Sequence, residues 1–211
     1  MLELYLIRHG QTDFSRENRF CGSIDPPLNE VGLKMADAFG EAYAGLEWDA
    51  IYASPSLRAR QTAGALANRI GLEIKVEDGL REIAYGDWES LRHEDVKKQW
   101  PEAYAYWSAD VASRGTPGGE TAFHVAARAA PVLERVRQYH SEGRVVLVSH
   151  KATIRILTCA LLGLDVRLFR DRIAQPVAAV TRFEIKKSGP LLTLLGDVSH
   201  LPASLRGIEG T

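Results

Sequence analysis

Residues 1–12 read MLELYLIRHGQT, and this stretch decides the fold class. Residues 2–7 form an apolar run with Glu3 as the only charge, and the run ends at the polar cluster Arg8-His9-Gly10. Such a run is typical of a strand that is buried on both faces, as strands of parallel sheets are. The sequence therefore predicts a central strand with polar side chains at its carboxyl end.

A second stretch repeats this pattern. Residues 144–149, RVVLVS, form a β-branched run that stops at His150, and residues 151–163, KATIRILTCALLG, then have a helical pattern. Ligands of open α/β sheets bind beyond the carboxyl ends of the strands. His9 and His150 both stand where that rule places chemistry.

The remaining elements alternate between helices and strands. Helices are predicted at 29–46, 56–70 and 121–140, and strands at 51–53, 74–76, 177–185 and 191–195. Pro131 lies inside the last of these helices and predicts a kink or a lost hydrogen bond. The alternation predicts an α/β fold, a three-layer sandwich around a mostly parallel central sheet.

A single domain over residues 1–211 accounts for the length of the chain. Its least regular part is the segment 84–119, which is rich in tryptophan and tyrosine. We predict that this insertion covers the active site. Trp88 and Trp107 are expected to pack in its interior, since aromatic residues are more often core residues than ligand platforms.

The overall charge limits the classes of binding partner that the sequence favours. The formal net charge is −1, so no global field marks a binder of nucleic acid or of anionic membranes. The amino-terminal residues lack a basic lead and a long apolar core, and no apolar stretch reaches membrane-spanning length. Cys21 and Cys159 belong to no close pair, which favours a reducing compartment, and we expect a cytoplasmic protein.

Metal and nucleotide motifs are missing from the sequence. No pair of histidines has helical metal-ligand spacing, and there is no Asp-rich loop or cysteine cluster. Gly118-Gly119 stands alone, without the lysine that follows a phosphate-binding loop. We therefore expect no metal site and no cofactor.

Arg8-His9-Gly10 combines a nucleophile with a fixed cation. The imidazole of His9 can attack phosphorus, Arg8 can hold phosphate oxygens, and the glycine permits close backbone approach. The competing interpretation is a strand-end histidine satisfied by a backbone carbonyl. Arg58, one turn into the helix at 56–70, can reach a phosphate, or it can lie on a solvated face as we expect for Arg60.

Glu82 stands between apolar residues just before the aromatic segment. Partial burial there is expected to raise its pKa toward that of a useful general acid. A surface ion pair is the competing interpretation.

Separated blocks of the chain together resemble the histidine phosphatase (phosphoglycerate mutase-like) superfamily, in content and in order. They are LYLIRHGQT (4–12), ENRFCGSIDPPLNEVG (17–32), YASPSLRARQTA (52–63), LREIAYGDWE (80–89), PGGET (117–121) and VLVSHKATIR (146–155). The resemblance implies that His9 becomes phosphorylated and that Arg8, Arg58 and His150 form a cationic phosphate pocket. It also implies that Glu82 protonates the leaving alcohol and that no metal takes part.

Several positions bear on the substrate. Ser15 stands where many relatives carry an asparagine that binds the phosphoryl group, and Cys21 and Gly22 lie in a stretch that flanks the substrate in mutase relatives. Lys151 is an extra cation that can select anionic substrates. The late Ser199-His200-Leu201 resembles bacterial metal-independent phosphoserine phosphatases and implies that His200 contacts the substrate, with a tail residue of no role as the alternative.

The resemblance favours a phosphatase of small metabolites, among them phosphoserine, phosphoglycerates and sugar phosphates. Tyr85 stands where the phosphoserine phosphatases tend to have histidine, which weakens that choice. A cofactor-dependent phosphoglycerate mutase and an inactive member that binds phospholigands or proteins are the alternatives. The family also implies a homodimer, and we expect His93, His124 and His140 to be surface residues.

Overall fold

The protein is built around a six-stranded sheet in the order β3-β2-β4-β1-β5-β6. We describe it from a computed structural model, which covers residues 1–208 and 210. The strands are β1 (Leu2–Arg8), β2 (Ala50–Ala53), β3 (Ile74–Val76), β4 (Gly143–Ser149), β5 (Val180–Lys186) and β6 (Gly189–Asp197). β1 to β4 pair in parallel, whereas β5 and β6 are antiparallel additions at one edge. The prediction of a mostly parallel sheet is confirmed.

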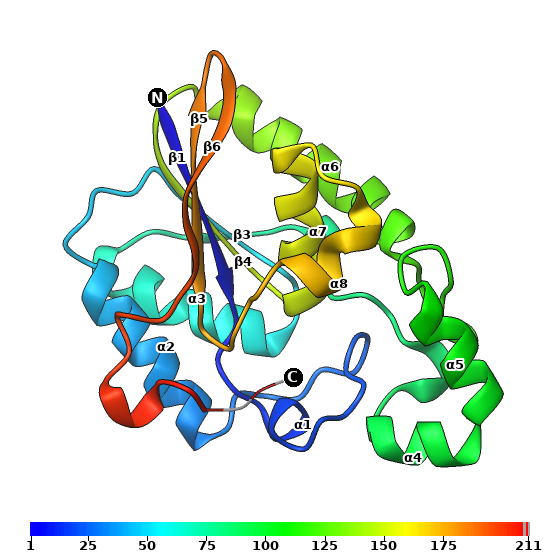
Figure 1. The fold of residues 1–211 in the computed structure, drawn as a ribbon. Helices are drawn as coiled ribbons and strands as arrows, with labels where there is room; N and C mark the ends of the chain where they lie inside the picture. Colours follow the sequence, from blue (N-terminus) through cyan, green and yellow to red (C-terminus); the bar gives the residue numbers. More distant parts are fainter. Residues whose placement is uncertain (209, 211) are drawn as a thin grey trace.

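Helices cover both faces of the sheet, as Figure 1 shows. They are α1 (Asp13–Arg16), α2 (Glu30–Tyr43), α3 (Leu57–Ile70), α4 (His93–Gln99), α5 (Pro101–Ala109), α6 (Ala122–Tyr139), α7 (Lys151–Leu162) and α8 (Phe169–Arg172). Leu4 and Leu6 of β1 pack with residues of α6 and α7, whereas Tyr5 and Ile7 pack with residues of α2 and α3. This alternation follows from the two-residue period of a strand and produces the predicted three layers.

Two predicted boundaries differ from the structure by three residues each. The helix predicted at 29–46 ends at Tyr43. The strand predicted from 177 begins at Val180, because Val177 and Ala178 form a turn in which Ala178 has a φ of 55°. Pro131 lies inside α6 on its exposed side, and the helix runs through it. The pyrrolidine ring of Pro131 therefore faces solvent and not a neighbouring helix or strand.

The segment 84–119 contains α4 and α5, which lie beyond the carboxyl end of β1 in Figure 1. Phe20 joins this segment to the amino-terminal part of the chain, since it packs with Trp88 and Val96 in a separate apolar cluster. The backbone of Phe20 also donates to the carbonyl of Leu91 at 2.9 Å. The segment is therefore attached to the loop that follows α1.

No helix among residues 1–208 is both long enough and apolar enough to cross a membrane.

Candidate active site

The register of the central strands brings the two predicted histidines together. Arg8 of β1 pairs with Ser149 of β4, so His9 and His150 are the next residues along two parallel neighbours. Their rings lie 5.1 Å apart between centroids. Ser54, which follows the next strand β2, has its hydroxyl 2.8 Å from Nε2 of His150. The carboxyl ends of three strands thus meet at one site.

His9 is held in one tautomer. Its Nδ1 lies 2.7 Å from the carbonyl oxygen of Gly10, and since a carbonyl only accepts, Nδ1 carries the proton. Nε2 therefore keeps its lone pair. Burial, with the charges of Arg58 and Arg8 next in importance, holds the pKa of His9 well below its usual range. At neutral pH the ring is a neutral nucleophile of fixed orientation.

Two guanidinium groups are buried beside this imidazole. Arg8 and Arg58 are each 1% exposed, a burial that arginine rarely reaches without a charged partner or ligand. Arg8 donates from Nη1 to the carbonyls of Gln175 and Gly210 at 2.9 and 3.0 Å. Burial lowers the pKa of Arg8 to about 9 against the opposing effect of Glu82, so it remains a cation at neutral pH.

Arg58 is fixed by the loop that contains Gly22. It donates from Nη1 to the carbonyl of Ile24 at 2.9 Å and from Nη2 to that of Gly22 at 3.3 Å. Asp25 lies 3.6 Å from Nη1 and also accepts from the backbone N–H of Leu57, the first residue of α3. The solvated-face interpretation is therefore wrong for Arg58, whereas Arg60 is exposed as expected.

His150 is completely buried. Burial, and then the charge of Arg58, holds its pKa well below the usual range. With Nε2 next to the Ser54 hydroxyl, Nδ1 has no hydrogen-bond partner among the described residues. A buried ring nitrogen of this kind is costly unless a ligand satisfies it.

Glu82 lies at the amino terminus of α7. One carboxylate oxygen accepts from the backbone N–H groups of Ile83 and Thr153 and from the Thr153 hydroxyl, and the other accepts from the N–H of Ala152. Glu82 is 8% exposed and has no ion pair within the described residues, so the surface ion-pair interpretation is wrong. These donors fix the orientation of the carboxylate in the site.

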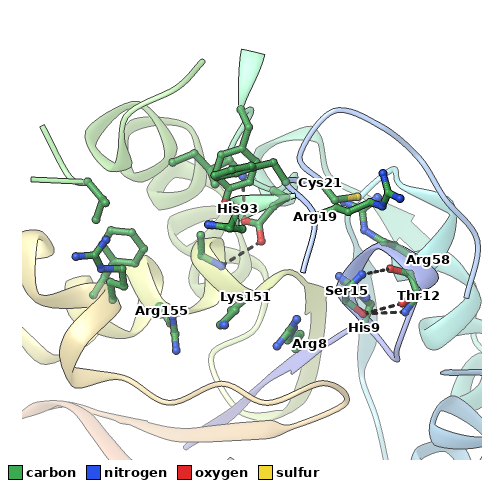
Figure 2. A pocket seen from close by; sticks show the side chains of 18 of the residues that line it. Arg8, His9, Thr12, Ser15, Arg19, Cys21, Arg58, His93, Lys151 and Arg155 are labelled. Carbon is green, nitrogen blue, oxygen red and sulfur yellow. Dashed lines mark hydrogen bonds between the residues drawn. The ribbon is translucent and has the colours of Figure 1, made fainter. Parts of the chain in front are cut away.

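Four of the five predicted catalytic side chains border one cavity, which is seen in Figure 2. His9, Arg8, Arg58 and Glu82 line it together with three predicted substrate contacts: Ser15, Cys21 and Lys151. Gly22 and His150 line a smaller adjoining cavity, and Glu82 borders both. The predicted catalytic residues are thus assembled around a hollow at the carboxyl ends of the strands.

Two of the predicted substrate contacts are already engaged within the protein. Ser15 donates its hydroxyl proton to the Thr12 carbonyl and accepts from the Thr12 N–H, both at 3.0 Å, as part of the cap of α1. The thiol of Cys21 lies 3.7 Å from the Ile24 carbonyl, and burial raises its pKa to about 11. It is therefore a neutral wall residue rather than a thiolate.

The structure does not bring His200 to the site. Its ring packs against Phe39 and Tyr43 of α2, with centroids 6.1 and 5.7 Å away, and it does not line either cavity. Both of its ring nitrogens are buried without a partner among the described residues. The interpretation as a substrate contact has no support from this position.

Two aromatic rings expected elsewhere line the main cavity. His93 is stacked on Phe20 at 3.8 Å between centroids, and burial lowers its pKa to about 4, so it is not a surface residue. Trp107 also lines the cavity, whereas Trp88 packs in the interior as expected. The placement of His93 and Trp107 depends on how α4 and α5 fold back on Phe20, for which the sequence has no local signal.

The other two histidines left outside the site lie elsewhere. His124 is exposed and caps the start of α6, and His140 is partly buried beside the hydroxyl of Tyr52 at 3.1 Å. Arg155 was not singled out from the sequence, although it lines the cavity. Arg155 stands four residues after Lys151 on a predicted helix, so both side chains lie on the same helix face. This spacing is the sequence feature that indicates Arg155.

Among the residues that the structure describes, no three His, Cys, Asp or Glu side chains come together in a way that would hold a metal ion.

The α/β sandwich and this set of side chains define a class, the phosphoric monoester hydrolases built on the phosphoglycerate mutase-like fold. The comparisons with known proteins agree. The chain belongs to the histidine phosphatase superfamily (branch 1), whose family model matches residues 4–198.

Several similar proteins are named as phosphatases. Phosphoserine phosphatase 1 of Hydrogenobacter thermophilus is 35% identical over 169 residues, which cover 80% of each chain. Glucosyl-3-phosphoglycerate phosphatase of Mycolicibacterium vanbaalenii is 37% identical over 171 residues, 77% of this chain and 75% of that one. Among solved structures, a mycobacterial glucosyl-3-phosphoglycerate phosphatase in complex with VO3 is 32% identical, with a TM-score of 0.84 over 92% of this chain and 98% of the other.

Proposed function

We propose that this protein hydrolyses small phosphate monoesters through a phosphohistidine on His9, with Glu82 as general acid and base and with no metal ion taking part. The observation that carries the proposal is the state of His9. Its Nδ1 proton is held by Gly10, its ring is neutral, and Arg8 and Arg58 line the same cavity. A phosphoryl group held by those cations would meet the Nε2 lone pair.

The first step transfers the phosphoryl group to the enzyme. Nε2 of His9 forms a bond to phosphorus while the bond from phosphorus to the ester oxygen breaks. Glu82 in its acid form gives its proton to that oxygen, which leaves as an alcohol.

The second step releases the phosphate. A water molecule attacks the phosphorus, Glu82 takes one of its protons, and the bond between nitrogen and phosphorus breaks. His9 regains its lone pair, and inorganic phosphate leaves. Arg8 and Arg58 would neutralise the charge that develops on the equatorial oxygens, the part that Mg²⁺ plays in kinases, and the His150 ring would add a hydrogen bond.

The segment 84–119 is proposed to cover the site. Tyr85, His93, Trp107 and Val111 of this segment line the main cavity. Exclusion of water by such a cover would strengthen the electrostatic interactions within the cavity. Phosphoserine, phosphoglycerates and sugar phosphates are the substrates to test first, since the relatives are named as phosphatases of phosphoserine and of glucosyl-3-phosphoglycerate.

The test is release of phosphate from such a panel, including an aryl phosphate, in the presence of a chelator. We expect release by the wild type and by a His124→Ala control, and none by His9→Ala. Rapid quench into alkaline denaturant, in which a histidine N–P bond survives, should trap labelled phosphoprotein only when His9 is present. Release that persists in His9→Ala, or that stops with the chelator, would overturn the proposal. Formation of an isomeric phosphoglycerate in place of phosphate would favour the mutase.

A further inference from the structure

The main cavity holds more positive charge than one phosphate requires. The cationic side chains that line it are Arg8, Arg19, Arg58, Lys151, Arg155 and Arg170, whereas Glu82 is the one carboxylate among its described lining residues. The proposed chemistry uses Arg8 and Arg58. The remaining cations need another explanation.

Arg19 and Arg170 have partners outside the cavity. Arg19 forms an ion pair with Glu17 at 2.7 Å and donates to the Ser90 carbonyl at 2.9 Å. Arg170 forms an ion pair with Asp171 at 3.3 Å and donates to the Ser108 carbonyl at 3.1 Å. Both can be explained by the attachment of loops at the rim.

Lys151 and Arg155 are different. They stand four residues apart on α7, so they project from the same face of the helix, and both are only partly exposed. Neither forms an ion pair or a side-chain hydrogen bond with any described residue, and Nε of Arg155 is fully buried without a partner. Figure 2 shows both side chains in the cavity wall on the side of Arg8.

Positive charge predominates around Lys151 and Arg155, and Glu82 opposes it. Burial, with Arg8 and Arg155 next in importance, lowers the pKa of Lys151 to about 8, and burial also lowers the pKa of Arg155. A partly buried cation without a counter-ion costs free energy that an anion in the cavity would recover. The helix face thus has the charge and the unsatisfied donors of an anion site.

We propose that Lys151 and Arg155 form a second anion subsite, which binds an anionic group on the leaving part of the substrate while His9, Arg8 and Arg58 hold the phosphoryl group. The inference rests on the proposed phosphatase function for the position of the phosphoryl group. It specifies the substrate class as phosphate monoesters whose alcohol carries a carboxylate or a second phosphate. Phe20, Ile83, Trp107 and Phe169 supply an apolar wall for the carbon skeleton between the two anions.

Matched substrates test the subsite. Glycerol 3-phosphate and 3-phosphoglycerate share a skeleton and differ in a hydroxymethyl group against a carboxylate. Fructose 6-phosphate and fructose 1,6-bisphosphate differ in a second phosphate. We expect the wild type to prefer the doubly anionic member of at least one pair by roughly 10- to 100-fold in kcat/KM, the contribution of a charge-assisted hydrogen bond. The pair that shows the preference identifies the second anion.

The variants are Arg155→Gln and Arg155→Lys, with Arg60→Gln as control because Arg60 is an exposed arginine outside the cavity. Arg155→Gln should lower kcat/KM for the doubly anionic substrate by far more than for its singly anionic partner, and so lose most of the preference. Arg155→Lys should retain a part of it. Equal loss for both members of a pair would indicate a merely structural role and would overturn the proposal.

A binding measurement separates this inference from the proposed function. Calorimetric titration of His9→Ala with glycerol 3-phosphate and 3-phosphoglycerate requires no turnover. Tighter binding of 3-phosphoglycerate, lost when Arg155→Gln is added, supports the subsite even if the wild type hydrolyses nothing, and then only the phosphatase proposal fails. Hydrolysis by the wild type with no preference within either pair would overturn the subsite and leave the phosphatase proposal intact.

Discussion

The reactive side chains of the site are oriented largely by backbone groups. Gly10 holds the His9 ring, Gly22 and Ile24 hold Arg58, and the amino terminus of α7 holds Glu82. Backbone groups move less than side chains, so these contacts preorganise the site before a substrate arrives. A substitution can therefore remove one function without displacing the others.

Glu82→Gln is expected to separate proton donation from binding. The variant keeps the size of the side chain but cannot protonate a departing oxygen. For an alkyl phosphate kcat/KM should fall by about 10²- to 10⁴-fold, the usual contribution of a general acid. For p-nitrophenyl phosphate the loss should be below about tenfold, because nitrophenolate leaves without a proton. Steady-state kinetics on both substrates measure the difference.

The melting temperature of Glu82→Gln provides the control, since the carboxylate also accepts from Ala152 and Thr153. A variant that melts like the wild type and yet loses equal activity on both substrates would show that Glu82 is not the acid.

At the scale of elements, the loop that follows β1 and contains Gly10 and Gln11 is in close backbone contact with α2. A Cβ on Gly32 would lie 2.0 Å from the carbonyl oxygen of Gln11, and one on Gly10 would lie 2.5 Å from that of Gly32. Glycine is required here for its lack of a side chain. The packing of α2 therefore helps to set the position of His9, although α2 contributes no residue to the main cavity.

Gly32→Ala is expected to destabilise the protein by about 1–3 kcal/mol through overpacking and to lower kcat, since a displacement of the loop of about 1 Å can cost 10²-fold. Gly64→Ala is the matched control: it lies in α3 with no atom within 4 Å of the added Cβ. That variant should gain about 0.5–1 kcal/mol from helix propensity. Urea denaturation and kinetics compare the two, and equal effects would rule out the steric explanation.

At the scale of the whole molecule, buried neutral histidines make stability depend on pH. The pKa values of His9 and His150 are well below 6.5, and that of His93 is lowered to about 4. As pH falls through about 6.5 the unfolded chain binds protons at these residues while the native state does not. Stability is therefore lost on acidification from about pH 7 toward the lower native pKa values.

We expect unfolding free energy to fall between pH 7.5 and 5.5 by about 1 kcal/mol for each such histidine, since one pH unit corresponds to 1.36 kcal/mol. Urea denaturation at constant ionic strength measures this. His93→Phe should reduce the dependence, whereas substitution of the exposed His124 by glutamine should leave it unchanged. A free energy that is the same at both pH values would contradict the burial of these rings as neutral groups.

Local patterns in the sequence determined the fold class and the residues of the candidate site. The apolar runs at 2–7 and 144–149 predict parallel strands because burial on both faces removes the alternation of polar residues. The chemistry follows directly from the ends of those strands, so His9 and His150 were predictable, and Arg58 and Glu82 were identified by the blocks that resemble the family. The register of β1 and β4 then brings the two histidines together.

Contacts between distant segments were decided by the tertiary structure alone. The stacking of His93 on Phe20, the burial of His200 against α2 and the unpaired state of Arg155 depend on which segments pack together and on which charges find partners. A periodic pattern indicates which face of an element is apolar, but it does not indicate which other segment packs against that face. For this reason the sequence determined the strand ends at which the candidate site lies, and the folded chain decided which further groups line its cavity.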